Sequence, residues 1–213
     1  MQKLALQSEK NSPQEYDRIF LERQKKGVDE HDLRRWRRLL KYYKGRRLID
    51  IGCLDSLIPV FARKKDPFSM IVGIDVASAT ITAQNDLMGH FAKFYKRDLY
   101  HTEFDDELFD YAVLGEVLEH LERPEDAIKE AMRILKPGGV LAISVPLDEA
   151  REPGAKDLHR HLWSFDKDDI IGMLSPYSSK IKTEVLGSIF SIRPPFYRYN
   201  FPNLLAWAKK KDA

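Results

Sequence analysis

A short apolar run near residue 50 places the strongest constraint on the fold of this chain. Leu48, Ile49 and Ile51 form the run, Gly52 ends it, and a helical pattern begins within a few residues. This order is typical of a buried parallel strand that leads into a helix. Because the ligands of parallel α/β sheets bind beyond the carboxyl ends of the strands, the loop at Gly52 is the first candidate for a binding site.

The alternation of strands and helices continues along the chain. Apolar patterns predict strands at residues 47–51, 70–74, 92–97, 109–114 and 140–145, with helices after residue 57 and at residues 78–88. A further helical stretch follows residue 116, and Pro124 restarts it and carries it to residue 135. The Lys-Pro-Gly-Gly segment at residues 136–139 predicts a turn. Five strands with helical crossovers predict a parallel, right-handed, doubly wound sheet.

Both ends of the chain add elements to this sheet. Residues 13–26 and 29–44 have the pattern of amphipathic helices, and we expect the apolar stripe of the second to pack on the sheet. They form a helical extension, residues 1–45, before a domain of residues 46–213. Near the other end, a helix at residues 166–174 precedes strands at residues 181–190 and 204–209. Since no helix fits between these two strands, they should pair as an antiparallel hairpin.

The charge of the chain is unevenly distributed. Residues 1–47 contain 14 Lys or Arg against 7 Asp or Glu, and the remaining residues contain 21 against 26. A basic segment can contact nucleic acid, although Lys and Arg are more commonly found simply because they lie on the solvent-exposed face of an amphipathic helix. No apolar run approaches the roughly 18 residues of a membrane span and no signal-peptide core is present, so we expect a cytoplasmic protein. The single cysteine, Cys53, excludes an internal disulfide.

The residues at the first two strand ends indicate the kind of ligand. Asp75 ends the second strand 23 residues after Gly52, where a carboxylate can accept hydrogen bonds from both ribose hydroxyls. The loop after Gly52 lacks the further glycines that admit a pyrophosphate, and Asp55 would repel phosphate oxygens there. A ribose-bearing ligand with a cationic or zwitterionic tail therefore suits these residues better than NAD.

Ordered motifs make the chain resemble the class I S-adenosylmethionine-dependent methyltransferases. The motifs are Asp50-Ile51-Gly52-Cys53, Gly73-Ile74-Asp75, Arg97-Asp98-Leu99, the segment 110–120 and the segment 135–141. The resemblance covers about residues 30–210, and it is to the small-molecule subgroup that includes the ubiquinone-biosynthesis type. It implies an enzyme with a Rossmann-like, doubly wound, mainly parallel seven-stranded sheet and a C-terminal antiparallel hairpin. It also implies S-adenosylmethionine as cofactor and S-adenosylhomocysteine as product.

The resemblance further implies which residues hold the cofactor. Asp50 and Gly52 would hold the methionine end, and Asp75 would accept from the ribose. Asp98, with the Leu99 amide beside it, would bind the adenine. The complete implied set is Asp50, Gly52, Cys53, Leu54, Asp75, Val76, Asp98, Leu99, Gly115 and Glu116. The family usually has glycines where this chain has Leu54 and Ser56, a departure that would narrow the methionine pocket.

Methyl transfer to an oxygen needs alignment and a base. The candidate bases are His120, after the fourth strand, and His159 and His161, in the loop after the fifth. A metal site is the alternative: Glu116, Glu119 and His120 have the spacing of one helical face, and a histidine from the later loop could complete a set of ligands for Mg²⁺. This pattern resembles that of metal-dependent small-RNA terminal 2′-O-methyltransferases, but metal-free small-molecule methyltransferases carry it too.

Three functions are compatible with these residues. The first is methyl transfer to an oxygen, or less favourably a nitrogen, of a small molecule such as a sugar, a quinone precursor or another secondary metabolite. The second is an RNA 2′-O-methyltransferase that is recruited by the basic N-terminal helix. The third is a non-catalytic scaffold that keeps the fold.

Overall fold

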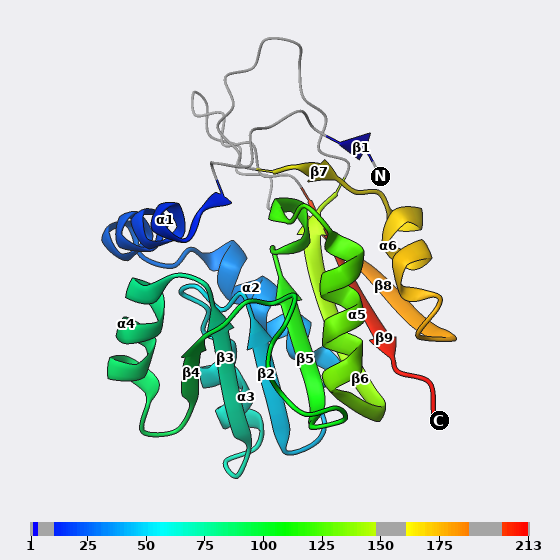
Figure 1. Cartoon of the computed structure of the whole chain (residues 1–213), viewed down its shortest axis with the longest axis horizontal. Coiled ribbons are helices and arrows are strands. Elements are labelled where there is room, and N and C mark those ends of the chain that lie inside the picture. Colours follow the sequence, from blue (N-terminus) through cyan, green and yellow to red (C-terminus); the bar gives the residue numbers. More distant parts are fainter. Residues whose placement is uncertain (1, 4–10, 148–160, 188–201, 213) are drawn as a thin grey trace.

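A seven-stranded sheet with the order β4-β3-β2-β5-β6-β9-β8 forms the centre of the molecule (Figure 1). The computed structural model describes residues 2–3, 11–147, 161–187 and 202–212. The strands of the sheet are β2 (Arg47–Ile51), β3 (Met70–Asp75), β4 (Lys93–Lys96), β5 (Phe109–Gly115), β6 (Leu135–Pro146), β8 (Lys180–Leu186) and β9 (Asn203–Lys209). Strands β2 to β6 pair in parallel, whereas β9 is antiparallel to both of its neighbours. The predicted mainly parallel sheet with an antiparallel C-terminal pair is confirmed.

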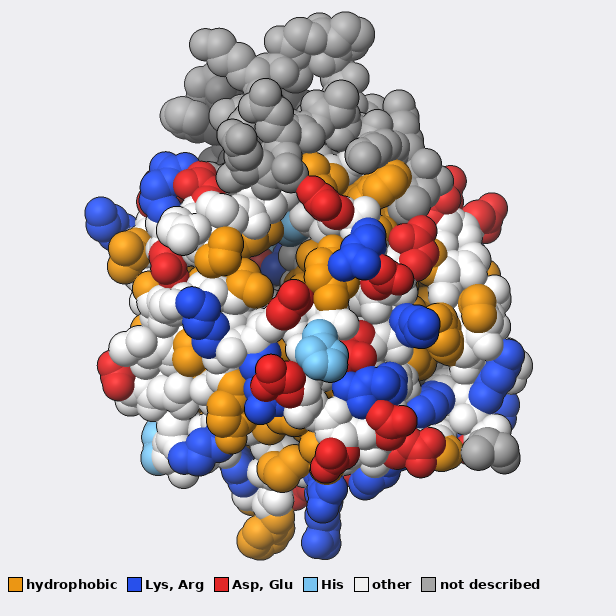
Figure 2. All heavy atoms as spheres, in the orientation of Figure 1, with side chains coloured by type: hydrophobic (Ala, Val, Ile, Leu, Met, Phe, Trp, Pro, Cys, Tyr) orange, Lys and Arg blue, Asp and Glu red, His pale blue; other side chains and the backbone are white. Residues whose placement is uncertain are grey.

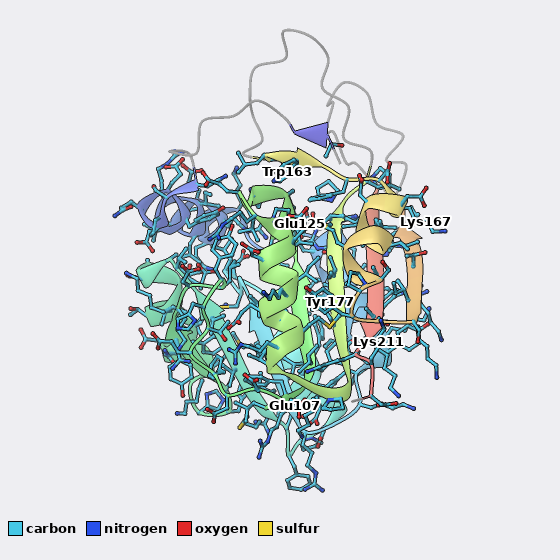
Figure 3. The ribbon with its side chains drawn as sticks, turned by 45° about the vertical axis from the view of Figure 1, so that its right-hand side comes forward. Glu107, Glu125, Trp163, Lys167, Tyr177 and Lys211 are labelled. Atoms are coloured by element: carbon cyan, nitrogen blue, oxygen red, sulfur yellow. The ribbon has the colours of Figure 1, made fainter. Side chains whose placement is uncertain are left out.

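Helices cover both faces of the sheet. The helices are α1 (Pro13–Lys26), α2 (Glu30–Leu39), α3 (Ile58–Lys65), α4 (Ser78–Met88), α5 (Pro124–Ile134) and α6 (Lys167–Leu174). Strand alternation divides the core: Ile49 packs in the apolar cluster under α5 and α6, whereas Leu48 packs in the cluster with α2 and α3. Figure 3 shows α5 and α6 on the near face, where the Lys211 amide donates to the Tyr177 carbonyl (3.0 Å). No helix in the described part of the chain is both long and apolar enough to cross a membrane.

The predicted N-terminal helices form, but the second is shorter than expected. Asp29 caps α2, and the α-helix ends at Leu39, followed by one 3₁₀ turn (Leu40–Tyr42), instead of continuing to residue 44. The Leu39 carbonyl accepts hydrogen bonds from the Tyr111 hydroxyl (2.5 Å) and the Trp207 indole (3.0 Å). These buried tertiary partners replace the helical bond that would have continued the helix. The domain boundary at residues 45 and 46 stays a prediction.

The segment 136–139, predicted as a turn before the fifth strand, lies within the single strand β6. The register between β5 and β6 shifts there, since Phe109 pairs with Leu135 but Tyr111 pairs with Val140. Gly138 adopts a left-handed backbone (φ +74°), and its amide donates to the Lys210 carbonyl (3.2 Å). The glycines therefore form an arch inside the strand. Lys210, just after β9, hydrogen-bonds to the backbone groups of this arch: its carbonyl accepts from Gly138 and its amide donates to Gly139.

Three smaller predictions also need correction. The crossover from β4 to β5, residues 97–108, contains no helix. The helical stretch expected after residue 116 is only one 3₁₀ turn (Leu118–His120) before α5. Strand β8 ends at Leu186, and residues 188–190 of the predicted strand lie outside the described residues. The two remaining strands, β1 (Gln2–Lys3) and β7 (Trp163–Ser164), pair in a separate small antiparallel sheet.

Candidate active site

A cavity of about 860 Å³ lies at the carboxyl ends of β2, β3 and β5. Figure 2 shows a hollow in the upper part of the visible face, and α1 lies at this edge in Figure 1. Eleven of the predicted site residues line the cavity: Gly52, Cys53, Leu54, Asp75, Val76, Asp98, Leu99, Gly115, Glu116, His120 and His161. Asp50 is not part of the lining, and His159 lies outside the described residues. The topology thus brings together side chains from four separate motifs.

Gly52 is required at the first turn of the cavity. Its backbone is left-handed (φ +73°), and a Cβ atom at this position would lie 2.6 Å from Cγ2 of Val117. The amides of Gly52 and Cys53 both donate to the Ile74 carbonyl at the end of β3 (2.9 and 3.0 Å). The loop is therefore fixed to the neighbouring strand by backbone bonds, and no side chain fits where Gly52 faces Val117.

Leu54 occupies a position where the resemblance leads us to expect glycine, and its backbone keeps a left-handed conformation (φ +31°). Such a backbone costs a non-glycine residue about 1–2 kcal/mol. Two hydrogen bonds hold it: the Leu54 amide donates to Oδ2 of Asp75 (3.0 Å), and the Leu54 carbonyl accepts from the Gln84 side chain (2.8 Å). Ser56, the other departure, is buried, and its hydroxyl accepts from the Ile58 amide at the start of α3 (3.0 Å). The loop thus accommodates both residues.

Asp75 presents a carboxylate at the end of β3. Oδ1 accepts from the Ala77 amide (2.9 Å) and Oδ2 from the Leu54 amide, so both oxygens have fixed positions. Burial raises the pKa of Asp75, while the Ala77, Leu54 and Val76 amides counteract this. Each carboxylate oxygen has a second lone pair, so the group can still accept from a ligand with two neighbouring hydroxyls.

Asp50 lies within β2 and is 3% exposed. Burial raises its pKa from 3.8 to about 7; the Ser56 hydroxyl lowers the pKa and the Asp75 carboxylate raises it further. Since Asp50 does not line the cavity, its predicted contact with the ligand stays a prediction.

Asp98 follows β4 and lines the cavity. Its Oδ1 accepts a hydrogen bond from the Tyr100 amide (2.9 Å).

Glu116 lines the cavity and is bound into a polar network with side chains of β6 and β9. Its backbone is left-handed (φ +57°), and its carboxylate accepts from the Ser144 hydroxyl and the Asn203 amide group (2.9 Å each). The Arg35 guanidinium lies 3.8 Å away. The predicted metal set of Glu116, Glu119 and His120 on one helical face is therefore wrong in geometry, because residue 116 is not helical and its carboxylate is engaged elsewhere.

Glu119, His120 and His161 instead form a compact group. One ligand atom from each can be found within 4.8 Å of the others, and Glu119 is 1% exposed. The two imidazole rings meet edge to face with centroids 4.8 Å apart, and Nε2 of His120 is 4.0 Å from the Glu119 carboxylate. The Tyr16 ring lies edge-on to His120 from α1 (6.2 Å). The metal alternative expected that a histidine from the later loop would lie beside His120. His161 is the histidine that the structure places there.

A network of four charged residues was not predicted as part of the site: Arg23, Arg35 and Asp55 line the cavity, and Asp32 lies beside it and pairs with both arginines. Arg23 of α1 donates to Asp55 (2.7 Å) and to Asp32 (2.8 Å), and Asp32 also pairs with Arg35 (2.6 Å). Arg35 is only 9% exposed, although basic residues of an amphipathic helix commonly face solvent. Asp32 and Arg35 are three residues apart on a predicted helix, and this spacing could have indicated their ion pair. Nothing in the sequence indicates that α1 packs against the loop at Asp55.

Fold and cavity together define a Rossmann-like α/β protein with a ligand pocket at the carboxyl edge of its sheet. Residues 49–143 match a family model described as a methyltransferase domain. A curated relative is the ubiquinone biosynthesis O-methyltransferase of Haemophilus ducreyi, 28% identical over 108 residues, which are 47% of this chain and 45% of the relative. These matches agree with the predicted resemblance to methyltransferases over the central part of the chain. The chain spans less than half the length of the curated relatives it matches.

Solved structures agree on the fold. The N-methyltransferase NodS of Bradyrhizobium japonicum, in complex with S-adenosylhomocysteine, superposes with a TM-score of 0.69 at 20% identity, over 94% of this chain and 98% of the other. The [4+2]-cyclase SpnF superposes with a TM-score of 0.74 at 18% identity, over the whole of both chains. At these identities the likeness establishes the fold and leaves the reaction open.

Proposed function

We propose that this protein transfers a methyl group from S-adenosylmethionine to an oxygen of a small-molecule acceptor. The observation that carries the proposal is that one cavity is lined both by the loop at Gly52 with Asp75 and Asp98, and by His120 and His161. We name these the cofactor half and the acceptor half of the cavity. The buried Glu119 carboxylate lies beside the two histidines, outside the lining. S-adenosylmethionine supplies an electrophilic methyl group when bound, and the protein's task is to align the acceptor with it.

The cofactor half suits the chemistry of this ligand. Asp75 would accept from the two ribose hydroxyls, and Asp98 would accept from the adenine amino group. Asp55 and Arg23 line the turn after Gly52 as an ion pair, and an amino-acid tail, which carries both an ammonium and a carboxylate, would contact the two partners of this pair. Each of these contacts would be charge-assisted, and such bonds are stronger than neutral ones.

In the acceptor half, His120 would accept the proton of the acceptor hydroxyl. The buried Glu119 carboxylate near its Nε2 would favour the protonated imidazole that results. The expected contribution of such a base is about 10²–10⁴-fold in rate. An acceptor with an acidic hydroxyl, such as a phenol, would need less assistance than a sugar.

The ion pairs made by the basic residues of the N-terminal extension favour a small-molecule acceptor over RNA. Arg35 is buried and paired with Asp32, while Arg38 and Lys41 pair with Glu184 of β8. Basic side chains that are already neutralised contribute little to phosphate binding. The basic residues that would recruit RNA are Arg34, Arg35, Arg37 and Arg38. Of these four, only Arg34 and Arg37 have no ion pair within the described part of the chain.

A divalent cation in the acceptor half is the second candidate. The carboxylate of Glu119 with two imidazoles is a donor set that transition metals and Mg²⁺ can share with water and substrate oxygens. Such an ion would ionise the acceptor hydroxyl directly. Activity that survives exhaustive EDTA treatment of the protein would exclude it, whereas loss of activity and recovery with one specific ion would support it.

Titration calorimetry with S-adenosylhomocysteine tests the cofactor half. We expect binding by the wild type, about tenfold weaker binding by Asp75→Asn because one good acceptor is lost, and unchanged binding by Asp86→Asn, an exposed control on α4. A wild type that does not bind would overturn both the small-molecule and the RNA function and leave the scaffold. Methyl transfer from labelled S-adenosylmethionine to a panel of phenols, sugars, amines and RNA then tests the acceptor class.

A further inference from the structure

A second cavity, of about 780 Å³, lies at the opposite edge of the sheet from the candidate active site. It is bounded by the loop before β2, the arch in β6 and the first residues of β8, together with the end of the antiparallel strand β9. Its lining includes Lys44, Lys136, Lys180, Lys182 and Lys209, and we name it the lysine cavity. The two cavities share no lining residue, so the lysine cavity is independent of the proposed function.

The lysine cavity has a surplus of positive charge. Its two acidic residues are Asp110 and Asp212. Asp110 is already engaged, since it accepts from Lys136 (2.6 Å) and from the amides of Arg46 and Arg47 (2.9 Å each). The other four lysines make no ion pair within the described residues, which leaves Asp212 alone to balance them.

Four of the five lysines lie in a part of the chain that is acidic overall. Beyond residue 47 the sequence has 26 Asp or Glu against 21 Lys or Arg, yet the lysines of the cavity come from four segments that are distant in sequence. Like charges that converge without acidic partners repel one another, and an anion removes that repulsion. The tertiary fold therefore creates an anion site that no local sequence motif encodes.

The aromatic side chains at the cavity indicate that charge, and not base stacking, would recognise the ligand. The ammonium of Lys182 lies 4.6 Å from the centroid of the Tyr42 ring, and that of Lys41 lies 5.4 Å from it. Trp207 meets Tyr42 edge to face and is 3% exposed. Cations and neighbouring rings thus occupy the aromatic surfaces on which a nucleobase would stack.

We propose that the lysine cavity binds a small anion that carries two or more adjacent phosphate groups. Lysine ammoniums are compact point charges that suit phosphate oxygens, and several of them can contact neighbouring phosphates together. The volume is within the range of small-ligand sites. Inorganic polyphosphate and the triphosphate chain of a nucleotide offer the same chemistry, and the experiment separates them.

Titration calorimetry of the full chain at low ionic strength, with tripolyphosphate, ATP and adenosine as probes, tests this inference. We expect tripolyphosphate and ATP to bind and adenosine not to bind. Lys180→Ala with Lys182→Ala should weaken binding by about tenfold or more, because two charge-assisted contacts are lost. Lys129→Ala with Lys167→Ala, exposed lysines outside both cavities, is the matched control and should change it less than about twofold.

Several results would overturn the proposal. The first is that the wild type shows no saturable binding of tripolyphosphate or ATP. The second is that the Lys180 and Lys182 double variant keeps wild-type affinity, and the third is that the control variant loses as much affinity as the double variant. ATP binding without tripolyphosphate binding, or with adenosine binding, would show recognition of the nucleoside instead. Binding of a short single-stranded RNA in the absence of tripolyphosphate binding would replace the small anion by a nucleic acid. Unchanged urea unfolding of the double variant verifies that the fold is intact.

Discussion

The two halves of the active-site cavity are built in different ways. In the cofactor half, short loops at the ends of β2 and β3 present Gly52, Leu54 and Asp75, and backbone amides fix each of them. In the acceptor half, a 3₁₀ turn, the segment before β7 and helix α1 contribute His120, His161 and Tyr16, and the His120 ring contacts the rings of the other two. One backbone bond, from the Leu162 amide to the Glu119 carbonyl (2.6 Å), joins the first two of these segments, which are distant in sequence. A site held by backbone bonds can be read from a local motif, whereas a site held by side chains requires the complete fold.

The largest expected effect is in the acceptor half. His120→Ala removes the proposed base, and we expect kcat for methyl transfer to fall by about 10²–10⁴-fold. The affinity for S-adenosylhomocysteine should stay unchanged, because His120 belongs to the other half of the cavity. Single-turnover kinetics and calorimetry measure the two quantities. A kcat within a few-fold of wild type, or an equal loss of cofactor affinity, would contradict the separation of the halves.

In the cofactor half, Gly52→Ala should weaken binding of S-adenosylhomocysteine by about 10- to 100-fold. The new methyl group would lie 2.6 Å from Val117 at a left-handed backbone position, at a cost of about 1–3 kcal/mol for the contact. Val117→Ala in the same protein should restore part of the affinity by removing the contacted methyl groups. Gly172→Ala is the control, because nothing lies within 4 Å of its added Cβ. Wild-type affinity in Gly52→Ala would disprove the steric argument.

Asp50 should make the stability of the cofactor half depend on pH. Its pKa is raised from 3.8 in the unfolded reference to about 7, so between these values the folded chain binds more protons than the unfolded chain. The free energy of unfolding from this group therefore falls as the pH rises from about 4 to about 7, by up to about 1.4 kcal/mol per pH unit, and is level above pH 7.

The comparison with Asp50→Asn isolates this contribution. The variant should lack this slope and be more stable than the wild type near pH 8, where the wild type must bury a charge. Urea unfolding of both proteins across the pH range gives the difference, and other titrating groups cancel in it. Parallel pH profiles for the two proteins would mean that Asp50 ionises normally in the fold.

The smallest expected effect concerns the contact between α1 and the cofactor loop. Arg23 bridges Asp55 and Asp32 from a partly buried position, and Arg23→Ala should lower the free energy of unfolding by about 1–2 kcal/mol. Arg18→Ala, an exposed residue of the same helix that pairs with Glu15 and Glu22, should leave it unchanged. Equal urea midpoints for the two variants would show that the bridge does not hold α1 in place.

The predictions that succeeded depended on local patterns. The bounds of β2 and α4 agree with the sequence prediction to the residue, because a short apolar run defines the strand and Gly89 directly follows the last residue of the helix. The predictions that failed were decided by distant partners. The α2 helix stops at Leu39 because Tyr111 and Trp207 donate to its carbonyl, and Glu116 leaves the expected helical face because Ser144 and Asn203 bind its carboxylate.

The sequence alone determined the layered α/β fold, the resemblance to methyltransferases and the positions of most cavity residues, because each of these depends on periodicity or on a short motif. Only the tertiary structure decided that Leu54 keeps a glycine-like backbone and that Glu119, with His120 and His161, forms the polar group opposite the cofactor loop. It alone brought the lysines of the second cavity together. These features depend on contacts between segments far apart in the chain, and no spacing within one segment records them.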